Sequence, residues 1–267
     1  MNQEEKLLKE WCKTNNVDYV LAKALSRKIL PLLAEARRRC GDTFDRVLLE
    51  QKRGTEIRLS NSERLRRILH NKLDPNKFSH GEVRAISLHI EFLMMVEGFF
   101  ATQINFLIFT LIANGHDFYS VRNGRYAKTF GEIEKEDLAY KMKFLKEHNF
   151  TELVKNEKRI RNLRNSIAHV FYEIESNGDV KIGKETISEK NYDEYYGYLR
   201  DIANIIHYIQ TRYYQIFMDS LSPEEKGRLT HVKLDKIKCS CGYENLLPQD
   251  RIIRGQQFRC TNCNKPI

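Results

Sequence analysis

Apolar residues recur three or four positions apart over most of the chain, which is the period of a helix that buries one face. This pattern predicts amphipathic helices over 4–14 and 18–40, and a separate basic helix that begins at Ser62 with Ser60 or Asn61 as its N-cap. Later segments with the same period are 138–145, 158–170 and 194–217. The tyrosines of the last segment could stack on bases, but a packing face explains them more simply.

The most apolar stretch runs from Ile86 to Ala113, where polar side chains interrupt it at intervals. It therefore predicts buried bundle helices and not a membrane span. A short segment from Phe171 to Ile182 has the alternating pattern of a β-hairpin around the turn residues 176–179. We predict an all-α fold with one small hairpin in the bundle.

Three regions are expected along the chain. An Asp-Pro pair within 73–77 predicts a break between a basic N-terminal helical region, residues 1–77, and a central helical bundle, residues 78–222. A cysteine-bearing segment, residues 231–267, follows. The chain contains no P-loop, no dinucleotide-binding fingerprint and no zinc-protease helix motif, so these classes of enzyme are not indicated.

The residues best suited to catalysis lie between Arg164 and His169. Asn165 and His169 are four positions apart and share a helix face, and the long side chain of Arg164 can reach round from a neighbouring face. Arginine stays charged and suits phosphate, whereas histidine gains or loses a proton near neutral pH. Together they could hold a phosphodiester and move a proton. The apolar positions that predict a helix here are Ile160, Leu163, Ile167 and Val170.

This segment resembles the R-x4-H motif of the HEPN superfamily, in the common form in which asparagine follows the arginine. The resemblance covers roughly residues 80–220, since Leu138 to Leu145 is similar to the amphipathic helix that usually precedes the motif and the hairpin to one often found after it. One position differs: some toxin members have a tyrosine two residues after the histidine, where this chain has Phe171 and then Tyr172. Modification chemistry at that tyrosine is therefore not implied.

The resemblance implies a HEPN-type bundle and a metal-independent endoribonuclease whose two protomers join their motif helices in one composite cleft. His169 would act as general base on a ribose 2′-hydroxyl or as general acid on the leaving 5′-oxygen. Arg164 would stabilise charge on the scissile phosphate, and Asn165 would orient either group. The products would carry a 2′,3′-cyclic phosphate and a 5′-hydroxyl, and DNA would resist. The resemblance also implies a prokaryotic role in antiviral defence or toxin-type growth arrest, with tRNA as one candidate substrate.

Other interpretations stay open. An arginine on a helix is usually a solvated charge, and a single helical histidine more often packs or caps than catalyses. The rival function is a non-catalytic HEPN adaptor that binds RNA or protein, and a third is a regulatory subunit that docks on a toxin or antitoxin partner. Glu91 and Glu97 are expected to face solvent or an interface, although one of them could orient His169 or Arg164.

Two close cysteine pairs near the C-terminus predict a zinc ribbon. They are Cys239 with Cys241, and Cys260 with Cys263. Each pair follows a short run of alternating character, and Gly242 permits a tight turn after the first pair, which is C-x-C and not the usual C-x-x-C. Four thiolates close the Zn²⁺ coordination shell, so the metal would be structural and would supply the folding energy of a segment too short for its own core.

A disulfide framework is the alternative for these cysteines. It is disfavoured because the sequence shows no export signal and because Cys12 and Cys40 lie far away in helical segments, as buried or idle thiols. Zinc ribbons bind nucleic acid or protein, and the basic residues of this one favour RNA. The candidate RNA contacts are Arg251, Arg254, Arg259 and Lys265 in the ribbon and Arg161 in the central region.

Charge is spread unevenly along the chain, whose formal net charge is +9. Residues 1–80 have a net charge of +7, residues 81–220 of −2, and residues 221–267 of +4. Basic flanks suit a protein whose appendages hold a polyanion while a near-neutral centre acts on it, although solvated surface charge explains them as well. We expect RNA and a second copy of the chain as partners, a cytoplasmic location and no membrane association.

Overall fold

The computed structural model describes residues 3–72, 80–127, 129–155, 157–169, 171–175, 177–220, 222, 234–241 and 244–248. The fold is 75% helical with few short strands, which confirms the predicted all-α class. The chain forms two compact units, Met1–Tyr214 and Gln215–Ile267. The predicted boundary at residue 77 lies outside the described residues and stays a prediction.

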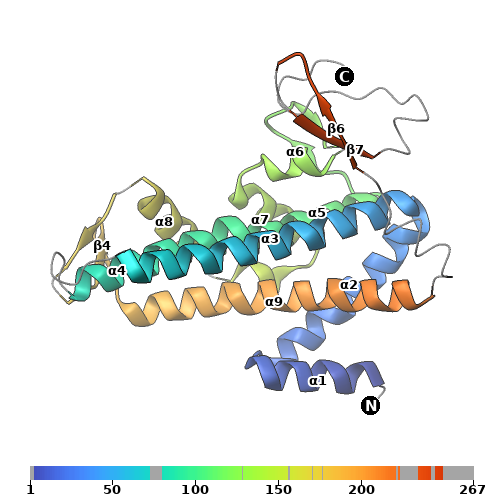
Figure 1. Cartoon of the computed structure of the whole chain (residues 1–267). Helices are drawn as coiled ribbons and strands as arrows, with labels where there is room; N and C mark the ends of the chain where they lie inside the picture. The colour runs from blue at the N-terminus through green and yellow to red at the C-terminus, as the bar shows by residue number, and fades with distance from the viewer. Residues whose placement is uncertain are drawn as a thin grey trace. The chain divides into compact units, whose positions relative to one another are not determined.

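The helical elements follow one another closely through the first unit. They are α1 (Gln3–Asn15), α2 (Tyr19–Cys40), α3 (Asp42–Lys72), α4 (His80–Leu93), the π-helix η1 (Met94–Phe100), α5 (Ala101–Ala113), α6 (Phe130–Glu134), α7 (Leu138–Glu147), the 3-10 turn η2 (Thr151–Val154), α8 (Glu157–Ala168) and α9 (Glu189–Ser220). Figure 1 shows α4 and α5 following one another in nearly a straight line, with α3 and α9 running alongside.

The strands are short and antiparallel. They are β1 (Tyr119–Ser120) with β2 (Arg125–Tyr126), β3 (Glu173–Ile174) with β4 (Val180–Ile182) and β5 (Glu185–Ile187), and β6 (Leu234–Lys238) with β7 (Glu244–Pro248). The hairpin predicted over 171–182 is therefore present as β3 and β4, and β5 extends it to a three-stranded sheet.

The N-terminal helices show how local sequence sets helix ends. Asp18 caps α2, because its carboxylate accepts the backbone N–H of Val20 at 2.7 Å. Gly41, with φ of 51°, ends α2, and α3 begins at the next residue. The separate helix predicted to begin at Ser62 is wrong, since α3 continues without a break from Asp42 to Lys72. The part of α3 before Ser62 is helical because helically spaced residues there are buried; they are Phe44, Leu48 and Thr55.

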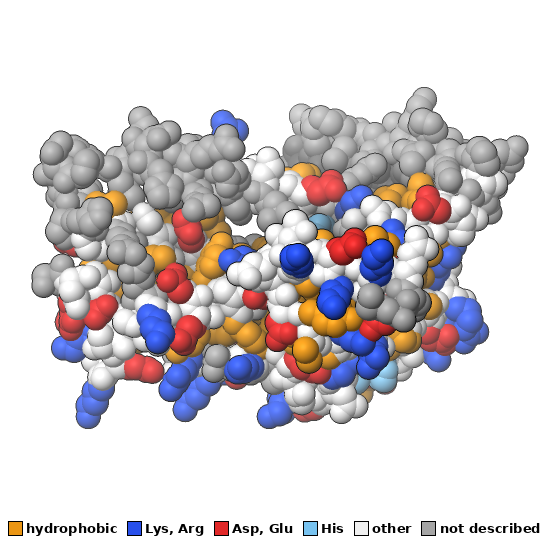
Figure 2. Space-filling view, turned by 90° about the horizontal axis from the view of Figure 1, so that it is seen from below, with side chains coloured by type: hydrophobic (Ala, Val, Ile, Leu, Met, Phe, Trp, Pro, Cys, Tyr) orange, Lys and Arg blue, Asp and Glu red, His pale blue; other side chains and the backbone are white. Residues whose placement is uncertain are grey.

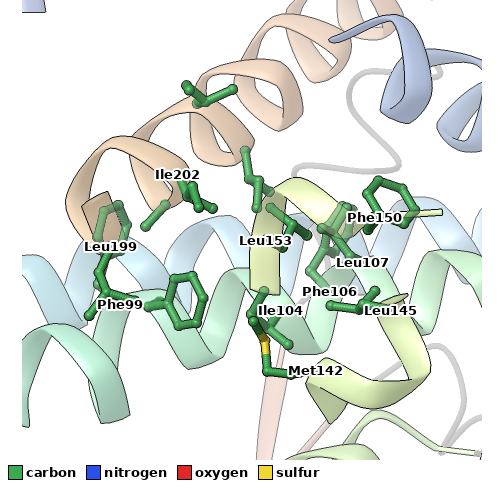
Figure 3. Packing of buried hydrophobic residues seen from close by; sticks show 14 of the residues in the cluster. Phe99, Ile104, Phe106, Leu107, Met142, Leu145, Phe150, Leu153, Leu199 and Ile202 are labelled. Carbon is green, nitrogen blue, oxygen red and sulfur yellow. The ribbon is translucent and has the colours of Figure 1, made fainter. Parts of the chain in front are cut away.

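The core forms where α5, α7, η2 and α9 meet. α5 is buried on nearly all sides because it packs against α2, α3, α6 and α7. Figure 3 shows the side chains of this cluster pointing toward one another from these elements. Its labelled members are Phe99, Ile104, Phe106, Leu107, Met142, Leu145, Phe150, Leu153, Leu199 and Ile202.

Among the described residues, one segment could cross a membrane by length and composition alone: Gly81–Ala113. Of its most apolar window, 67% is buried inside the protein. A core helix passes the same test, and packing against several helices accounts for the apolar surface of this one.

A buried histidine lies in the core beside α9. His89 is 2% exposed, and neither of its ring nitrogens has a hydrogen-bond partner among the described residues. Its ring lies edge-on to Tyr172, with centroids 4.4 Å apart, and near Tyr192 at 5.5 Å. Burial lowers the pKa of His89 from 6.5 to about 4, because the charged imidazolium is poorly solvated there.

We expect His89 to make the fold sensitive to acid. Between about pH 6.5 and pH 4 the unfolded chain binds a proton at this residue that the folded chain does not, so stability is complete above this window and falls as the pH drops through it. Lowering the pH from 7 to 5 should cost about 2 kcal/mol through this residue. Urea unfolding of the wild type and of His89→Phe at both pH values measures it. Equal acid sensitivity of the two proteins would assign the effect to other groups.

Candidate active site

The motif begins on α8 and ends at the first residue after it. The predicted helix is present from Glu157 to Ala168, and its inward face consists of the predicted apolar positions Ile160, Leu163 and Ile167, all of them buried. Val170, the last predicted apolar position, lies outside the described residues. These buried side chains hold α8 against α4 and α7, and they turn the polar residues of the motif away from the core.

Arg164 is bound to a carboxylate from a distant part of the chain. Its guanidinium Nε donates to Glu97, and its Nη1 donates to the side-chain oxygen of Asn165 at 2.9 Å. Glu97 belongs to η1, where the backbone N–H of Ala101 donates to the carbonyl of Val96 in the wider turn of a π-helix. Of the two acidic residues expected to face solvent or an interface, Glu97 is exposed and faces the motif.

A charged cleft of about 630 Å³ opens beside this pair. α3, η1, α5, α6, α7, α8 and the β1–β2 turn contribute to its walls. Its basic residues are Arg58, Arg122, Lys135, Lys141, Arg161 and Arg164, and its acidic residues are Glu97, Glu134, Glu136 and Asp137. Cations outnumber carboxylates in this lining, so the cleft suits an anionic ligand that competes with the carboxylates for the basic side chains.

Several cations of the cleft are already held by acidic neighbours. Arg58 reaches from α3 to Glu134 at 3.3 Å, and Arg122 lies 3.7 Å from Asp137. Arg161, predicted as an RNA contact, lines the cleft and pairs with Glu157 one turn earlier at 3.1 Å. Such partly exposed pairs are weak, about 0–1 kcal/mol each, so a phosphate can displace their carboxylates.

His169 lies at the end of α8. It is the first residue after the helix, and its backbone N–H still donates to the carbonyl of Asn165 at 3.0 Å, which keeps the two residues one helical turn apart. The side chain is exposed. In the described part of the chain, the residues that line the cleft include Arg164 and Asn165 but not His169. One chain thus brings the first two predicted catalytic residues together and leaves the histidine on the surface.

Two buried polar groups face the floor of the cleft. Asn105 on α5 is 3% exposed, and the part of the chain that the structure describes offers its side-chain oxygen no hydrogen-bond partner. Lys141 on α7 is also 3% exposed, and its ammonium donates to the carbonyl of Glu134 at 3.0 Å. Burial lowers the pKa of Lys141 from 10.5 to about 8, although the nearby carboxylates oppose this shift.

Replacing Lys141 by methionine should stabilise the protein by about 3 kcal/mol at pH 7, because the folded state no longer has to bury an ammonium group. Between about pH 8 and pH 10.5 the folded lysine is neutral while the unfolded one is charged, so wild-type stability rises with pH and the advantage of the variant shrinks. Urea unfolding at pH 7 and pH 9.5 measures both effects. Loss of stability at pH 7 would mean that the contact to Glu134 outweighs desolvation.

Most of the cleft was not predictable from the sequence. Arg58, Arg122 and Asn105 carried no sequence signal, because each reaches the cleft only through the packing of its own element. Lys141 did carry one: it lies three positions after Leu138 and four before Leu145, on the buried face of its helix. A lysine on an apolar face is rare unless it has a function or a partner.

The tyrosines of α9 serve packing, as expected. Tyr192 and Tyr195 are buried. The other tyrosines of the predicted packing face lie against the core; these are Tyr196, Tyr198, Tyr208, Tyr213 and Tyr214.

Figure 2 shows one face of the molecule, and on its described part basic side chains are scattered and alternate with acidic ones. This face therefore does not offer a polyanion a continuous basic surface.

The first predicted metal-binding pair lies on a hairpin turn in the C-terminal unit. Strand β6 ends at Lys238, the turn carries Cys239 and Cys241, and β7 returns antiparallel with Lys238 opposite Glu244. The Cys239 side chain is 3% exposed. Cys260 and Cys263, and the ribbon residues Arg251, Arg254, Arg259 and Lys265, lie outside the described residues. Two thiols on one turn suit Zn²⁺. Among the described residues, no group of three or more His, Cys, Asp or Glu side chains could hold a metal ion.

The two remaining cysteines lie in the first unit. Cys12 is buried and Cys40 is exposed, and neither is in a disulfide.

No protein-family model, no curated protein and no solved structure matches this chain.

Proposed function

We propose that this protein is a metal-independent endoribonuclease with a HEPN-type bundle. The observation that carries the proposal is that Arg164 and Asn165 line a cleft rich in cations, while His169 follows directly after the end of α8, one turn beyond Asn165. The cations of the cleft can bind phosphates, and the imidazole of His169 can transfer a proton to or from RNA bound there. We take the resemblance of the motif to HEPN nucleases as the second support.

The proposed reaction is attack of a ribose 2′-hydroxyl on the adjacent phosphorus. One imidazole nitrogen of His169 takes the 2′-hydroxyl proton while water protonates the departing 5′-oxygen, or the protonated ring gives its proton to that oxygen while water takes the 2′-hydroxyl proton. The P–O5′ bond breaks as the new P–O2′ bond forms, which leaves a 2′,3′-cyclic phosphate and a 5′-hydroxyl. Arg164 stabilises the negative charge that builds up on the phosphate oxygens, and Asn165 orients the guanidinium to which it is hydrogen-bonded.

Two copies of the chain are proposed to form each site. In one copy the imidazole is exposed at the end of α8, and the described cleft lining includes only Arg164 and Asn165 of the motif. A second copy docked against α8 brings another histidine to the cleft edge and excludes water from it. The rate per chain should then rise with protein concentration until the dimer is fully formed.

Glu97 is proposed to hold the guanidinium until RNA arrives. Its carboxylate occupies the position that a phosphate oxygen takes in the complex, and it keeps Arg164 extended toward the cleft. A phosphodiester competes for the same donor with an equal charge and adds contacts to other cleft cations. The exchange therefore costs little when a phosphate chain enters.

A structural zinc ion is proposed for the C-terminal unit, held by Cys239, Cys241, Cys260 and Cys263. The metal would tie the β6–β7 turn to the later cysteine pair and take no part in cleavage. Together with Arg161, the ribbon residues Arg251, Arg254, Arg259 and Lys265 are proposed to bind RNA. A role in prokaryotic defence or growth arrest, in the cytoplasm, rests on the family resemblance.

The proposal is tested by incubating the pure protein with end-labelled tRNA and mixed RNA in EDTA. Cleavage is expected, with 2′,3′-cyclic phosphate ends on the products. RNA methylated at every 2′-oxygen, and DNA of the same sequence, should stay intact because they lack the nucleophile. Binding of RNA without cleavage at any protein concentration would support the non-catalytic adaptor instead, and copurification of a second protein would indicate the regulatory subunit.

A further inference from the structure

The hairpin at the mouth of the cleft exposes two aromatic rings. Tyr119 and Tyr126 face each other across the β1–β2 ladder, with ring centroids 5.6 Å apart and planes nearly perpendicular at 85°. Tyr119 is 44% exposed and Tyr126 is 56% exposed. Val121, between them in the sequence, is 61% exposed. Large apolar side chains gathered on so short an element mark a binding surface more often than a packing surface.

The hairpin is firmly built beneath these rings. Phe118, which precedes β1, is buried, and its carbonyl accepts the backbone N–H of Ala127 after β2 at 2.8 Å. The hydroxyl of Ser120, fully buried, donates to the carboxylate of Glu136 at 2.5 Å. The same carboxylate accepts the backbone N–H of Arg122 at 3.1 Å. A buried carboxylate thus closes the turn, so the tyrosines are held in place before any ligand binds.

The hairpin is joined to the charged cleft. Arg122, at the turn, lines the cleft with its side chain 60% exposed, and Glu136, which anchors the turn, lines it as well. Arg125 lies on β2 next to Tyr126 and is 57% exposed. Aromatic rings beside guanidinium groups and a cation-lined cleft are the combination with which proteins bind single-stranded nucleic acid.

We propose that the β1–β2 hairpin is a base-stacking platform that makes the protein select single-stranded RNA. An unpaired base stacks on Tyr119 or Tyr126 while the phosphates that follow it enter the cleft past Arg122. A base pair within a duplex cannot reach the rings, because both of its faces are covered by neighbouring pairs. That the polymer is RNA rests on the proposed ribonuclease function. That the hairpin binds a single strand is inferred from the hairpin and the cleft alone.

The test uses the full-length protein and a fluorescein-labelled single-stranded RNA methylated at every 2′-oxygen, which binds but does not react. Fluorescence anisotropy compares the wild type with the double variants Tyr119→Ala/Tyr126→Ala and Tyr119→Phe/Tyr126→Phe. The alanine variant should bind the single strand about 10-fold or more weakly, as expected for the loss of one stacked base. The phenylalanine variant, which keeps both rings, should bind like the wild type.

A duplex of the same length is the matched probe. The duplex should bind more weakly than the single strand, through its phosphates, and its affinity should be the same for all three proteins. Wild-type affinity of the alanine variant for the single strand would overturn the proposal, as would an equal loss for single strand and duplex, or a loss in the phenylalanine variant as large as in the alanine variant. Circular dichroism spectra establish that the variants are folded.

These outcomes are separate from those that test cleavage. If the protein fails to cut RNA but the alanine variant loses single-strand binding, the ribonuclease proposal fails and the platform stands. If the protein cuts RNA and the alanine variant binds normally, the platform fails and the ribonuclease proposal stands.

Discussion

Replacing His169 by alanine is expected to lower the rate of RNA cleavage by about 10²–10⁴-fold, the usual worth of a positioned acid–base group. The protein should stay folded, because the side chain is exposed. Cleavage of labelled RNA under single-turnover conditions, with circular dichroism on the same samples, measures both effects. Affinity for RNA methylated at its 2′-oxygens should change little, since the histidine is proposed to act on the reacting atoms.

Matched variants on the same helix make this expectation specific. Arg164→Ala should also strongly reduce cleavage, and it should weaken RNA binding as well, because the guanidinium is proposed to contact the phosphate before and during the reaction. Arg159→Ala removes an exposed arginine that is not among the described residues lining the cleft, and it should cleave like the wild type. Equal cleavage by all four proteins would identify a contaminating nuclease and end the proposal.

Removal of zinc should unfold the C-terminal segment and leave the helical unit intact. Structural zinc sites contribute about 10–16 kcal/mol of binding free energy at neutral pH, which is then folding free energy for a segment that has little core. The wild type should contain one zinc ion per chain, and Cys239→Ser should contain none. Limited proteolysis followed by mass spectrometry should then show rapid cleavage after α9 in the variant and slow cleavage in the wild type.

Cys40→Ser is the control for that experiment, because Cys40 is an exposed thiol in the first unit and is not a proposed ligand. It should keep the metal and the wild-type pattern of proteolysis. Cys239→Ser should still cleave RNA at saturating concentration, since the metal is proposed to be structural. Full protease resistance of metal-free protein would contradict the ribbon.

The buried polar groups of the cleft lower the stability of the folded protein. Lys141 and Asn105 are buried polar groups at its floor, and a core built for stability alone would have apolar residues there. Functional sites commonly hold such groups, because chemistry and recognition require desolvated charge. The buried lysine therefore supports the cleft as a site, independently of the motif on α8.

Helix positions followed from the sequence where local signals agreed. The helix predicted over 18–40 is α2, because Asp18 supplies its cap and its buried positions repeat at helical spacing. The inward face of α8 was predicted from Ile160, Leu163 and Ile167 for the same reason. The start predicted at Ser62 failed, because a capping residue begins a helix only where the chain before it is not already helical, and α3 is helical from Asp42.

Spacing along the chain was enough to predict which face of each helix is apolar and which residues share a helical turn. It thus placed Asn165 and His169 one turn apart. What the motif contacts became visible only in the folded chain. Glu97 and Arg164 are 67 positions apart, and they pair because the π-helical turn of η1 and the packing of α8 against α4 bring them together. Contacts of that kind depend on how helices dock, which no local pattern encodes.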